Sequence, residues 1–316
     1  MKRIVLFVLA ALALASCSGG DEPVRAIYHW KTTYNPTTYE QQWLRDHRVQ
    51  RLYLRLFDVD ACGYSRDACG YSREDGNAAP IATTRFLQPL PDDMEVIPVV
   101  YITNEAMDRM NIHLVASLLA ERVEKMAECN GFELTELQVD CDWTGRTKQA
   151  YYRFCDVLRS ILHEKNVRLS STVRLHQVDT TLADLPVDGR VLMVYNTGDL
   201  RSPQTANSIL DYSDVKPYLR RIDASMLDSM DFAWPVFGWG VAFDANGRFQ
   251  RLVPSSALAS DTSSASLREE WGRVDDIQRV QRRLPARGRH TTILYHLDSL
   301  NLSKYTYDEI ETIYSR

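Results

Sequence analysis

The feature that most constrains the fold of this chain is a regular alternation of short apolar runs with amphipathic stretches. Eight runs rich in Val, Ile, Leu, Tyr and Phe predict strands at residues 26–30, 51–57, 96–103, 137–142, 168–175, 191–197, 232–243 and 291–297. Helical patterns lie between them at residues 38–47, 111–130, 147–166, 215–228, 266–284 and 307–314. Strands that alternate with helices predict a parallel sheet of the α/β class, and eight such units favour a closed (β/α)8 TIM barrel. The helices after the second and fifth strands are poorly marked.

The first 25 residues do not continue this alternation, and they predict a targeting segment rather than part of the barrel. Lys2 and Arg3 precede an unbroken apolar run at residues 4–15, which is too short to span a bilayer comfortably. The sequence Leu-Ala-Ser-Cys at residues 14–17 resembles the bacterial lipobox. We therefore expect a signal peptide at residues 1–16, a lipidated Cys17, a flexible tether at residues 17–25 and one barrel domain at residues 26–316. An ordinary secretory signal with a chance cysteine is the alternative.

Lipidation would make the membrane a partner of this chain through Cys17. Several acyl chains anchor a protein stably, whereas a single chain is marginal. Ser18 follows the cysteine, which indicates the bacterial outer membrane rather than the inner one. The acidic residues of the tether, Asp21 and Glu22, resemble the surface-export signals of Bacteroidetes lipoproteins. We expect a lipid-anchored protein of the outer membrane, exposed at the cell surface.

Charge and motifs argue against several classes of function. The formal net charge of −5 becomes −7 once Lys2 and Arg3 are removed, and no basic cluster is present, so nucleic acid is not an expected partner. The chain has no H-E-x-x-H, no C-x-x-C and no Gly-rich phosphate loop, so we expect neither a metal nor a cofactor. Five cysteines remain beside Cys17, so at least one thiol stays unpaired. Cys62 with Cys69, or Cys129 with Cys155, are possible disulfides between which the sequence does not choose.

Two carboxylates occupy one face of the predicted strand at residues 137–142. Side chains alternate across a strand, so Gln138, Asp140 and Asp142 share one face, while Cys141 and Trp143 share the other. A buried carboxylate costs several kcal/mol unless it is paired or hydrogen-bonded. Two of them at the end of a core strand therefore favour a functional role. The alternative is a structural bond to backbone amides or to an arginine of a neighbouring strand.

This segment resembles the signature of family-18 glycoside hydrolases, the chitinase-like barrels, which carry D-G-x-D-x-D-W-E on their fourth strand. Asp140, Cys141, Asp142 and Trp143 fit D-x-D-W, but Leu137 replaces the first Asp. Thr144 stands where the family has its catalytic Glu, the general acid. Two weaker matches follow in order: residues 193–196, which resemble M-x-Y-D with Asn for Asp, and residues 294–298, which resemble the eighth-strand segment with Tyr for Trp.

The resemblance implies a carbohydrate ligand, in particular N-acetylated sugars, whose acetamido group the family orients with the Asp at the position of Asp142. Asp140, Tyr195 and Asn196 would then still contribute to binding. The carboxyl ends of barrel strands meet at one mouth. There we expect aromatic side chains to stack on sugar faces beside a further acid: Trp143, Trp239, Tyr295 and Asp298. Trp239 lies between two glycines and could equally be a packed barrel residue.

Three hypotheses follow for function. The first is a glycan-binding barrel with little or no hydrolysis, because a threonine hydroxyl is too weak an acid to replace a carboxylic acid. The second is an active glycoside hydrolase that uses Asp142, with Asp140, and a relocated second carboxylate. Glu105, Asp199 and Asp298 are the candidates for it, although Glu105 could equally be a first-turn acid of a helix. The third is a non-catalytic scaffold lipoprotein.

Overall fold

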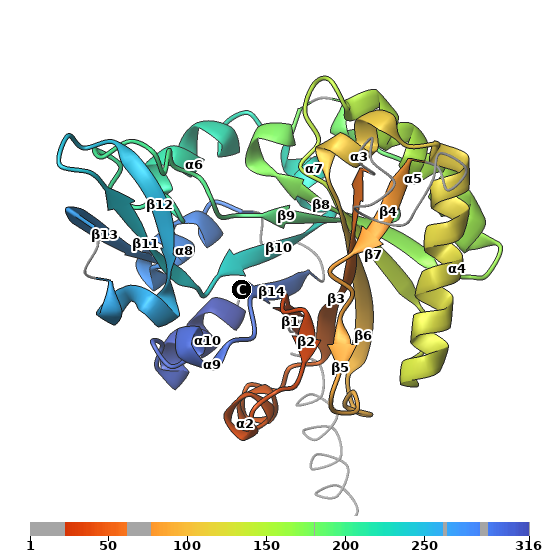
Figure 1. Cartoon of the computed structure of the whole chain (residues 1–316), viewed down its shortest axis with the longest axis horizontal. Coiled ribbons are helices and arrows are strands. Elements are labelled where there is room, and N and C mark those ends of the chain that lie inside the picture. Colours follow the sequence, from red (N-terminus) through yellow and green to blue (C-terminus); the bar gives the residue numbers. More distant parts are fainter. Residues whose placement is uncertain (1–22, 62–76, 180, 262–263, 285–289, 316) are drawn as a thin grey trace, which may run out of the picture.

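The computed structural model describes residues 23–61, 77–179, 181–261, 264–284 and 290–315. Its centre is a closed barrel of eight parallel strands, and the pairing of β1 with both β14 and β3 closes the ring (Figure 1). The barrel strands are β1 (Val24–His29), β3 (Arg51–Ala61), β6 (Glu95–Ile102), β7 (Glu136–Asp140), β8 (Arg168–Arg174), β9 (Gly189–Met193), β10 (Met230–Pro235) and β14 (Thr291–Tyr295). The predicted (β/α)8 barrel is confirmed.

Helices cover most of the outside of the barrel (Figure 1). They are α2 (Thr38–Asp46), α3 (Asn104–Arg109), α4 (Ile112–Asn130), α5 (Lys148–His163), α6 (Tyr212–Leu219), α7 (Ala224–Leu227), α8 (Val274–Gln281), α9 (Ser299–Leu302) and α10 (Tyr307–Tyr314). Between β3 and β6 the described residues form no helix but the short strands β4 (Ala78–Ile81) and β5 (Arg85–Phe86). β4 pairs antiparallel with β3, and β5 pairs with β2 (Thr33–Tyr34). After β8 come only the 3-10 turns η2 (Leu175–Gln177) and η3 (Leu182–Asp184).

Local sequence explains where α4 begins and ends and which face of α5 is buried. α4 begins after Asn111, whose side chain accepts a hydrogen bond from the backbone N–H of Leu114, and ends at Gly131 in the left-handed conformation at φ 70°. α5 buries one apolar stripe that includes Phe154 and Leu158 against the barrel. No helix in the described ranges is long and apolar enough to cross a membrane.

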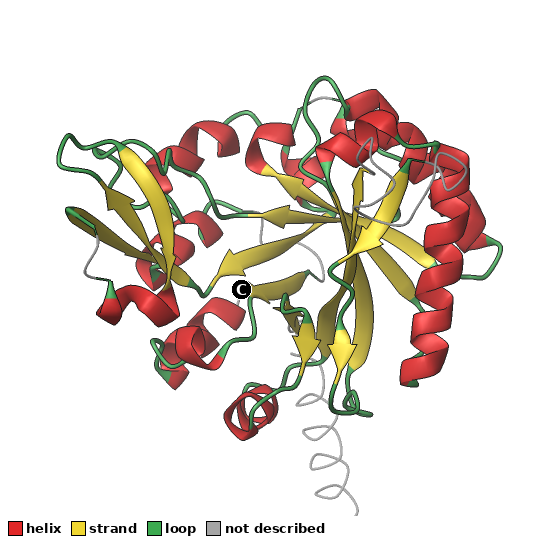
Figure 2. Cartoon of the chain, viewed as in Figure 1, coloured by secondary structure: helices red, strands yellow, loops and turns green. Residues whose placement is uncertain are grey.

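A second, antiparallel sheet lies beside the barrel and corrects two sequence predictions (Figure 2). The single strand predicted at residues 232–243 is wrong, because β10 ends at Pro235 and β11 (Gly238–Phe243) belongs to the second sheet. The helix predicted at residues 266–284 is wrong in its first half, where β13 (Ser266–Trp271) pairs with β11. β12 (Phe249–Pro254) completes the sheet on the other side of β11, and the 3-10 turn η4 (Ser255–Ser260) follows it. Pairing with β11 outweighs the local helical pattern of this segment.

The structure describes three of the cysteines and so tests one of the two possible disulfides. Cys129 is exposed, Cys141 and Cys155 are buried, and all three are free thiols, so the possible pair of Cys129 with Cys155 is not formed. The possible pair of Cys62 with Cys69 lies outside the described residues, as do the predicted signal peptide and Cys17.

Candidate functional site

A pocket of about 690 Å³ opens at the carboxyl ends of the barrel strands, where (β/α)8 barrels carry their sites. Its charged lining comes from the barrel itself: Arg55, Asp58, Asp140, Asp142, Arg174 and Asp298. Its aromatic lining comes from the barrel strands and the loops that follow them, and from the start of β11: Trp30, Tyr101, Tyr195, Phe237, Trp239 and Tyr295. Residues 252–256 of β12 and η4 also line it. The second sheet therefore contributes to the wall of the pocket.

Asp142 and Arg174 form a two-point ion pair across neighbouring strands. β7 pairs with β8 up to Val139 and Ser171, and the same offset, continued beyond the end of β7, brings Asp142 beside Arg174. Nε of Arg174 donates to Oδ1 of Asp142, and Nη2 donates to Oδ2 at 2.9 Å. The Asp142 side chain is 34% exposed, so the pair faces the pocket. Both carboxylate oxygens of Asp142 are therefore already hydrogen-bonded to a cation.

Asp140 lies one step deeper on the same face of β7 and has a different environment. The same register sets it level with Thr172, whose hydroxyl donates to Oδ1 of Asp140 at 2.5 Å. Only 6% of the residue is exposed. Burial, with the charge of Asp142 adding to it, raises the pKa of Asp140 from 3.8 to about 6. Asp140 is therefore a buried carboxyl group, and its ionised form is less stable than that of an aspartate exposed to water.

The other two pocket carboxylates are also paired with cations. Arg55 of β3 donates from Nε and Nη2 to the two oxygens of Asp58, at 2.8 and 2.5 Å. Lys31 places its Nζ 3.0 Å from Oδ2 of Asp298. Burial would raise the pKa of Asp298, but the hydrogen bond and charge of Lys31 outweigh burial and lower it. Of the four described carboxyl groups that line the pocket, only Asp140 lacks an ion-pair partner.

Tyr295 is the centre of an aromatic cluster on the opposite side of the mouth. Its ring centroid lies 5.1 Å from Tyr195, 5.6 Å from Phe237 and 5.7 Å from Trp30. Contacts at these distances stabilise the rings against one another and fix their orientations. The result is an aromatic surface that lines the same pocket as the charged groups.

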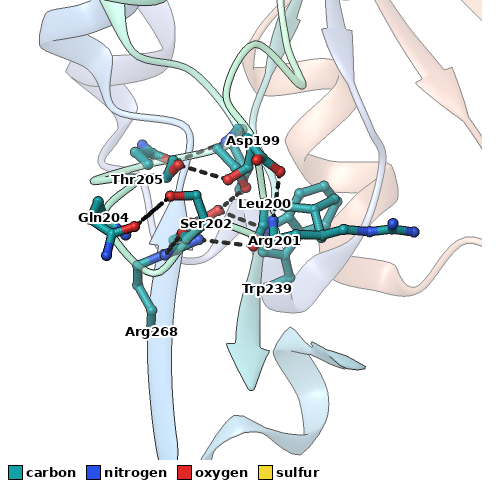
Figure 3. Close-up of polar contacts among 12 residues, drawn as sticks. Asp199, Leu200, Arg201, Ser202, Gln204, Thr205, Trp239 and Arg268 are labelled. Carbon is teal, nitrogen blue, oxygen red and sulfur yellow. Dashed lines mark hydrogen bonds and ion pairs between the residues drawn. The ribbon is translucent and has the colours of Figure 1, made fainter. Parts of the chain in front are cut away.

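Trp239 is fixed on the pocket wall by a buried glutamate. Its Nε1 donates to Oε2 of Glu270 at 2.9 Å, and Arg268 donates to Oε1 of Glu270 at 2.6 Å. Arg268 also donates to the carbonyl oxygens of Ser202 at 2.8 Å and Leu200 at 3.3 Å, which ties the loop after β9 to β13 (Figure 3). The predicted glycan-binding tryptophan is therefore held by side chains of β13.

The structure brings together seven of the residues predicted for the site. They are Asp140, Asp142, Tyr195, Asn196, Trp239, Tyr295 and Asp298. Trp143 does not join them. It is buried on the helical side, 6.0 Å from the ring of Tyr152 and beneath Lys148, because strand alternation turns it away from Asp142.

Two candidates for a relocated second carboxylate also lie outside the pocket lining. Glu105 is a first-turn acid of α3, with a side chain that is 60% exposed and an ion pair of 3.0 Å to Arg109. Asp199 accepts a hydrogen bond from the backbone N–H of Arg201 at 2.9 Å within its own loop (Figure 3). Thr144 is exposed as well, and its backbone N–H donates to the hydroxyl of Thr147 at 2.9 Å.

Sequence analysis missed Arg55 and the wall formed by residues 252–256. Arg55 had a signal, because an arginine within an apolar strand needs a buried partner and Asp58 lies three residues further on. Nothing in the sequence indicates that residues 252–256 line the pocket, since their position beside it depends on how the second sheet packs against the barrel. Within the described residues, no group of three or more His, Cys, Asp or Glu side chains is arranged to hold a metal ion.

Comparison with known proteins identifies the fold. No family model matches the chain, and no curated protein matches its sequence. Among solved structures, a chitinase from Chromobacterium violaceum is 13% identical with a TM-score of 0.56, over 93% of this chain and 99% of that one. The spore cortex-lytic enzyme SleL of Bacillus cereus is 15% identical with a TM-score of 0.54, over 91% and 76%. A Group IV chitinase of Ostrinia furnacalis, in complex with allosamidin, is 11% identical with a TM-score of 0.56, over 92% and 98%. This chain has a divergent chitinase-like barrel fold.

Proposed function

We propose that this chain binds glycans containing N-acetylated sugars at the barrel mouth and hydrolyses them little or not at all. The observation that carries the proposal is the pocket itself, which is lined both by the rings around Tyr295 and by charged side chains at the carboxyl ends of β3, β7 and β8. Aromatic faces stack on sugar rings, and fixed carboxylate and guanidinium groups bind hydroxyls. The chitinase fold of the similar structures agrees with a carbohydrate ligand.

Two observations support weak or absent hydrolysis. Thr144 stands at the position of the family's general acid, is exposed and does not line the pocket. A two-carboxylate mechanism needs a second free carboxyl group about 5–9.5 Å from the first. Asp58, Asp142 and Asp298 are each paired with a cation, so that among the described carboxyl groups of the pocket lining only Asp140 has no ion-pair partner. Loss of a well-placed general acid typically reduces the rate about 10²–10⁴-fold.

Binding is tested by titrating the protein with the N-acetylglucosamine tetrasaccharide and with allosamidin by calorimetry. We expect saturable binding, weakened about tenfold or more by Asp142→Asn, because a hydrogen bond to a charged group contributes about 1.5–3 kcal/mol. Glu105→Gln, which removes a carboxylate near the mouth but outside the pocket lining, is the matched control and should bind as the wild type does. Absence of binding to any glycan would contradict the proposal and leave the scaffold hypothesis.

The lipoprotein assignment is a separate proposal that rests on residues 14–17 and on the acidic tether. We propose that Cys17 is lipidated and holds the barrel at the bacterial outer membrane. Cys17→Ser should then release the protein into a soluble or unprocessed form. Partition of the wild-type protein into the aqueous phase of a detergent separation would contradict the assignment.

A further inference from the structure

The lining of the pocket carries more negative than positive charge. Two arginines face four carboxyl groups there, which leaves a net charge of −2 when all six are ionised. Lys31, which is not part of the lining, compensates Asp298. His296 does not add to the balance at neutral pH, because burial lowers its pKa to about 4. A net negative pocket favours a cationic group on its ligand and disfavours an anionic one.

The uncompensated charge is localised on Asp140. Thr172 donates to Oδ1, while Oδ2 has no hydrogen-bond partner among the described residues. Arg174, the nearest guanidinium by strand register, gives both Nε and Nη2 to Asp142 instead. Asp140 is 6% exposed and lines the pocket. A buried carboxylate with an open oxygen is stabilised strongly by a ligand that donates N–H bonds and carries positive charge.

Three tyrosines line the same pocket as this carboxyl group and have free hydroxyls. Burial is the largest cause of the raised pKa values of Tyr101, Tyr195 and Tyr295, and the charges of Asp140 and Asp142 both add to it for all three. None of their hydroxyls has a hydrogen-bond partner in the described part of the chain, although Tyr195 is only 6% exposed. All three line the pocket. Aromatic faces attract cations, and free hydroxyls can accept hydrogen bonds from an ammonium group.

We propose that the sugar unit held against Asp140 is a hexosamine with a free ammonium group, within a partly de-N-acetylated glycan. This inference rests on the proposed function and refines its substrate class. An ammonium group offers three N–H donors and a charge, whereas an acetamido group offers one N–H and no charge. The charge of Asp142, the acetamido partner that the family resemblance implies, is already compensated by Arg174, although its oxygens can still accept further hydrogen bonds. Asp140, with its open oxygen and its tyrosines, fits the ammonium.

The test compares two ligands of equal length by calorimetry on the wild-type protein. The glucosamine tetrasaccharide should bind about tenfold tighter than the N-acetylglucosamine tetrasaccharide, since a charge-assisted bond exceeds a neutral one by about that factor. Asp140→Asn should abolish the preference, and Glu105→Gln should retain it. A thermal melt confirms that each variant is folded. Spermine, a polyamine without sugar rings, should not displace the glucosamine ligand.

The other possible results of these titrations would contradict either the ammonium proposal or the proposed function. Equal or tighter binding of the N-acetylated ligand would overturn this inference and leave the proposed function intact. Absence of binding for both ligands would overturn the proposed function, and this inference with it. If Asp140→Asn still prefers the glucosamine tetrasaccharide, or if spermine displaces this ligand, the ammonium groups are attracted by the overall negative charge of the protein and not bound by Asp140. Either result would overturn this inference. The wild-type comparison decides the class of ligand even if Asp140→Asn does not fold.

Discussion

The two sides of the barrel mouth hold their side chains by different means. On the side of β7 and β8, the two acids are hydrogen-bonded to side chains of the neighbouring strand β8, Asp142 to Arg174 and Asp140 to Thr172. On the side of β10 and β11, Trp239 is held through Glu270 and Arg268, which come from β13. The first side depends on the barrel alone, whereas the second depends on a separate sheet. Changes in the second sheet should therefore alter one half of the pocket and spare the other.

The largest effect is expected from breaking the buried pair behind Trp239. Glu270→Leu leaves Arg268, whose side chain is 17% exposed, without its carboxylate. We expect the free energy of unfolding to fall by about 3–5 kcal/mol, because an uncompensated buried charge is strongly unfavourable. Chemical denaturation measures this change. Glu269→Gln, at the exposed neighbouring position, should change stability by less than about 0.5 kcal/mol. Equal effects of the two variants would show that Glu270 does not hold the wall.

A smaller effect is expected from removing the tryptophan itself. Trp239→Ala deletes an aromatic surface of the pocket while leaving Glu270 and Arg268 paired. Glycan affinity should fall about 10–100-fold, in line with the loss of about 1.5–3 kcal/mol of apolar contact. Tyr39→Ala, which removes an aromatic ring that is 45% exposed and outside the pocket lining, serves as the control in the same calorimetric titration. Unchanged affinity in Trp239→Ala would exclude this ring from binding.

The smallest effect concerns the pH dependence of stability on the β7 side. Burial raises the pKa of Asp140 from 3.8 in the unfolded chain to about 6, so the folded state binds the proton more tightly. The stability that this proton contributes is complete below the unfolded pKa and is lost as the pH rises through the folded one. Wild-type protein should therefore lose about 1 kcal/mol relative to Asp140→Asn between about pH 5 and about pH 7.5.

Denaturation of both proteins at the two pH values measures this difference. The comparison within one pair of proteins cancels the contribution of His29 and His296, whose pKa values burial lowers to about 4. A difference between the two proteins that does not change with pH would show that Asp140 is not desolvated. The carboxyl group of Asp140 would then be exposed to water rather than buried on the β7 side of the mouth.

The sequence predicted the barrel and the face of β7 that carries the acids, because period-two alternation is a local property. That same alternation places Trp143 away from the pocket, and the family resemblance misplaced it. The partners of the acids could not be predicted in this way. Arg174 and Thr172 become neighbours of Asp142 and Asp140 only through the register of β7 against β8, which depends on the whole barrel.

The second sheet was missed for a similar reason. β13 carries a local pattern compatible with a helix, and its pairing partner β11 lies more than twenty residues away in sequence. Close packing enforces this arrangement, since a Cβ on Gly238 would lie 2.3 Å from the Trp271 ring. Neither constraint is visible in a short window of sequence. The half of the site that depends on this sheet was therefore predicted only through Trp239.

The proposed function is the binding of glycans at the pocket without their hydrolysis. The most direct measurement incubates the wild-type protein with the N-acetylglucosamine tetrasaccharide and its partly de-N-acetylated forms at saturating concentrations, and quantifies the shorter sugars released. We expect saturable binding with no more release than in the protein-free control. Release well above that control, abolished by Asp142→Asn, would contradict the proposed function and identify an active hydrolase whose second carboxylate is relocated.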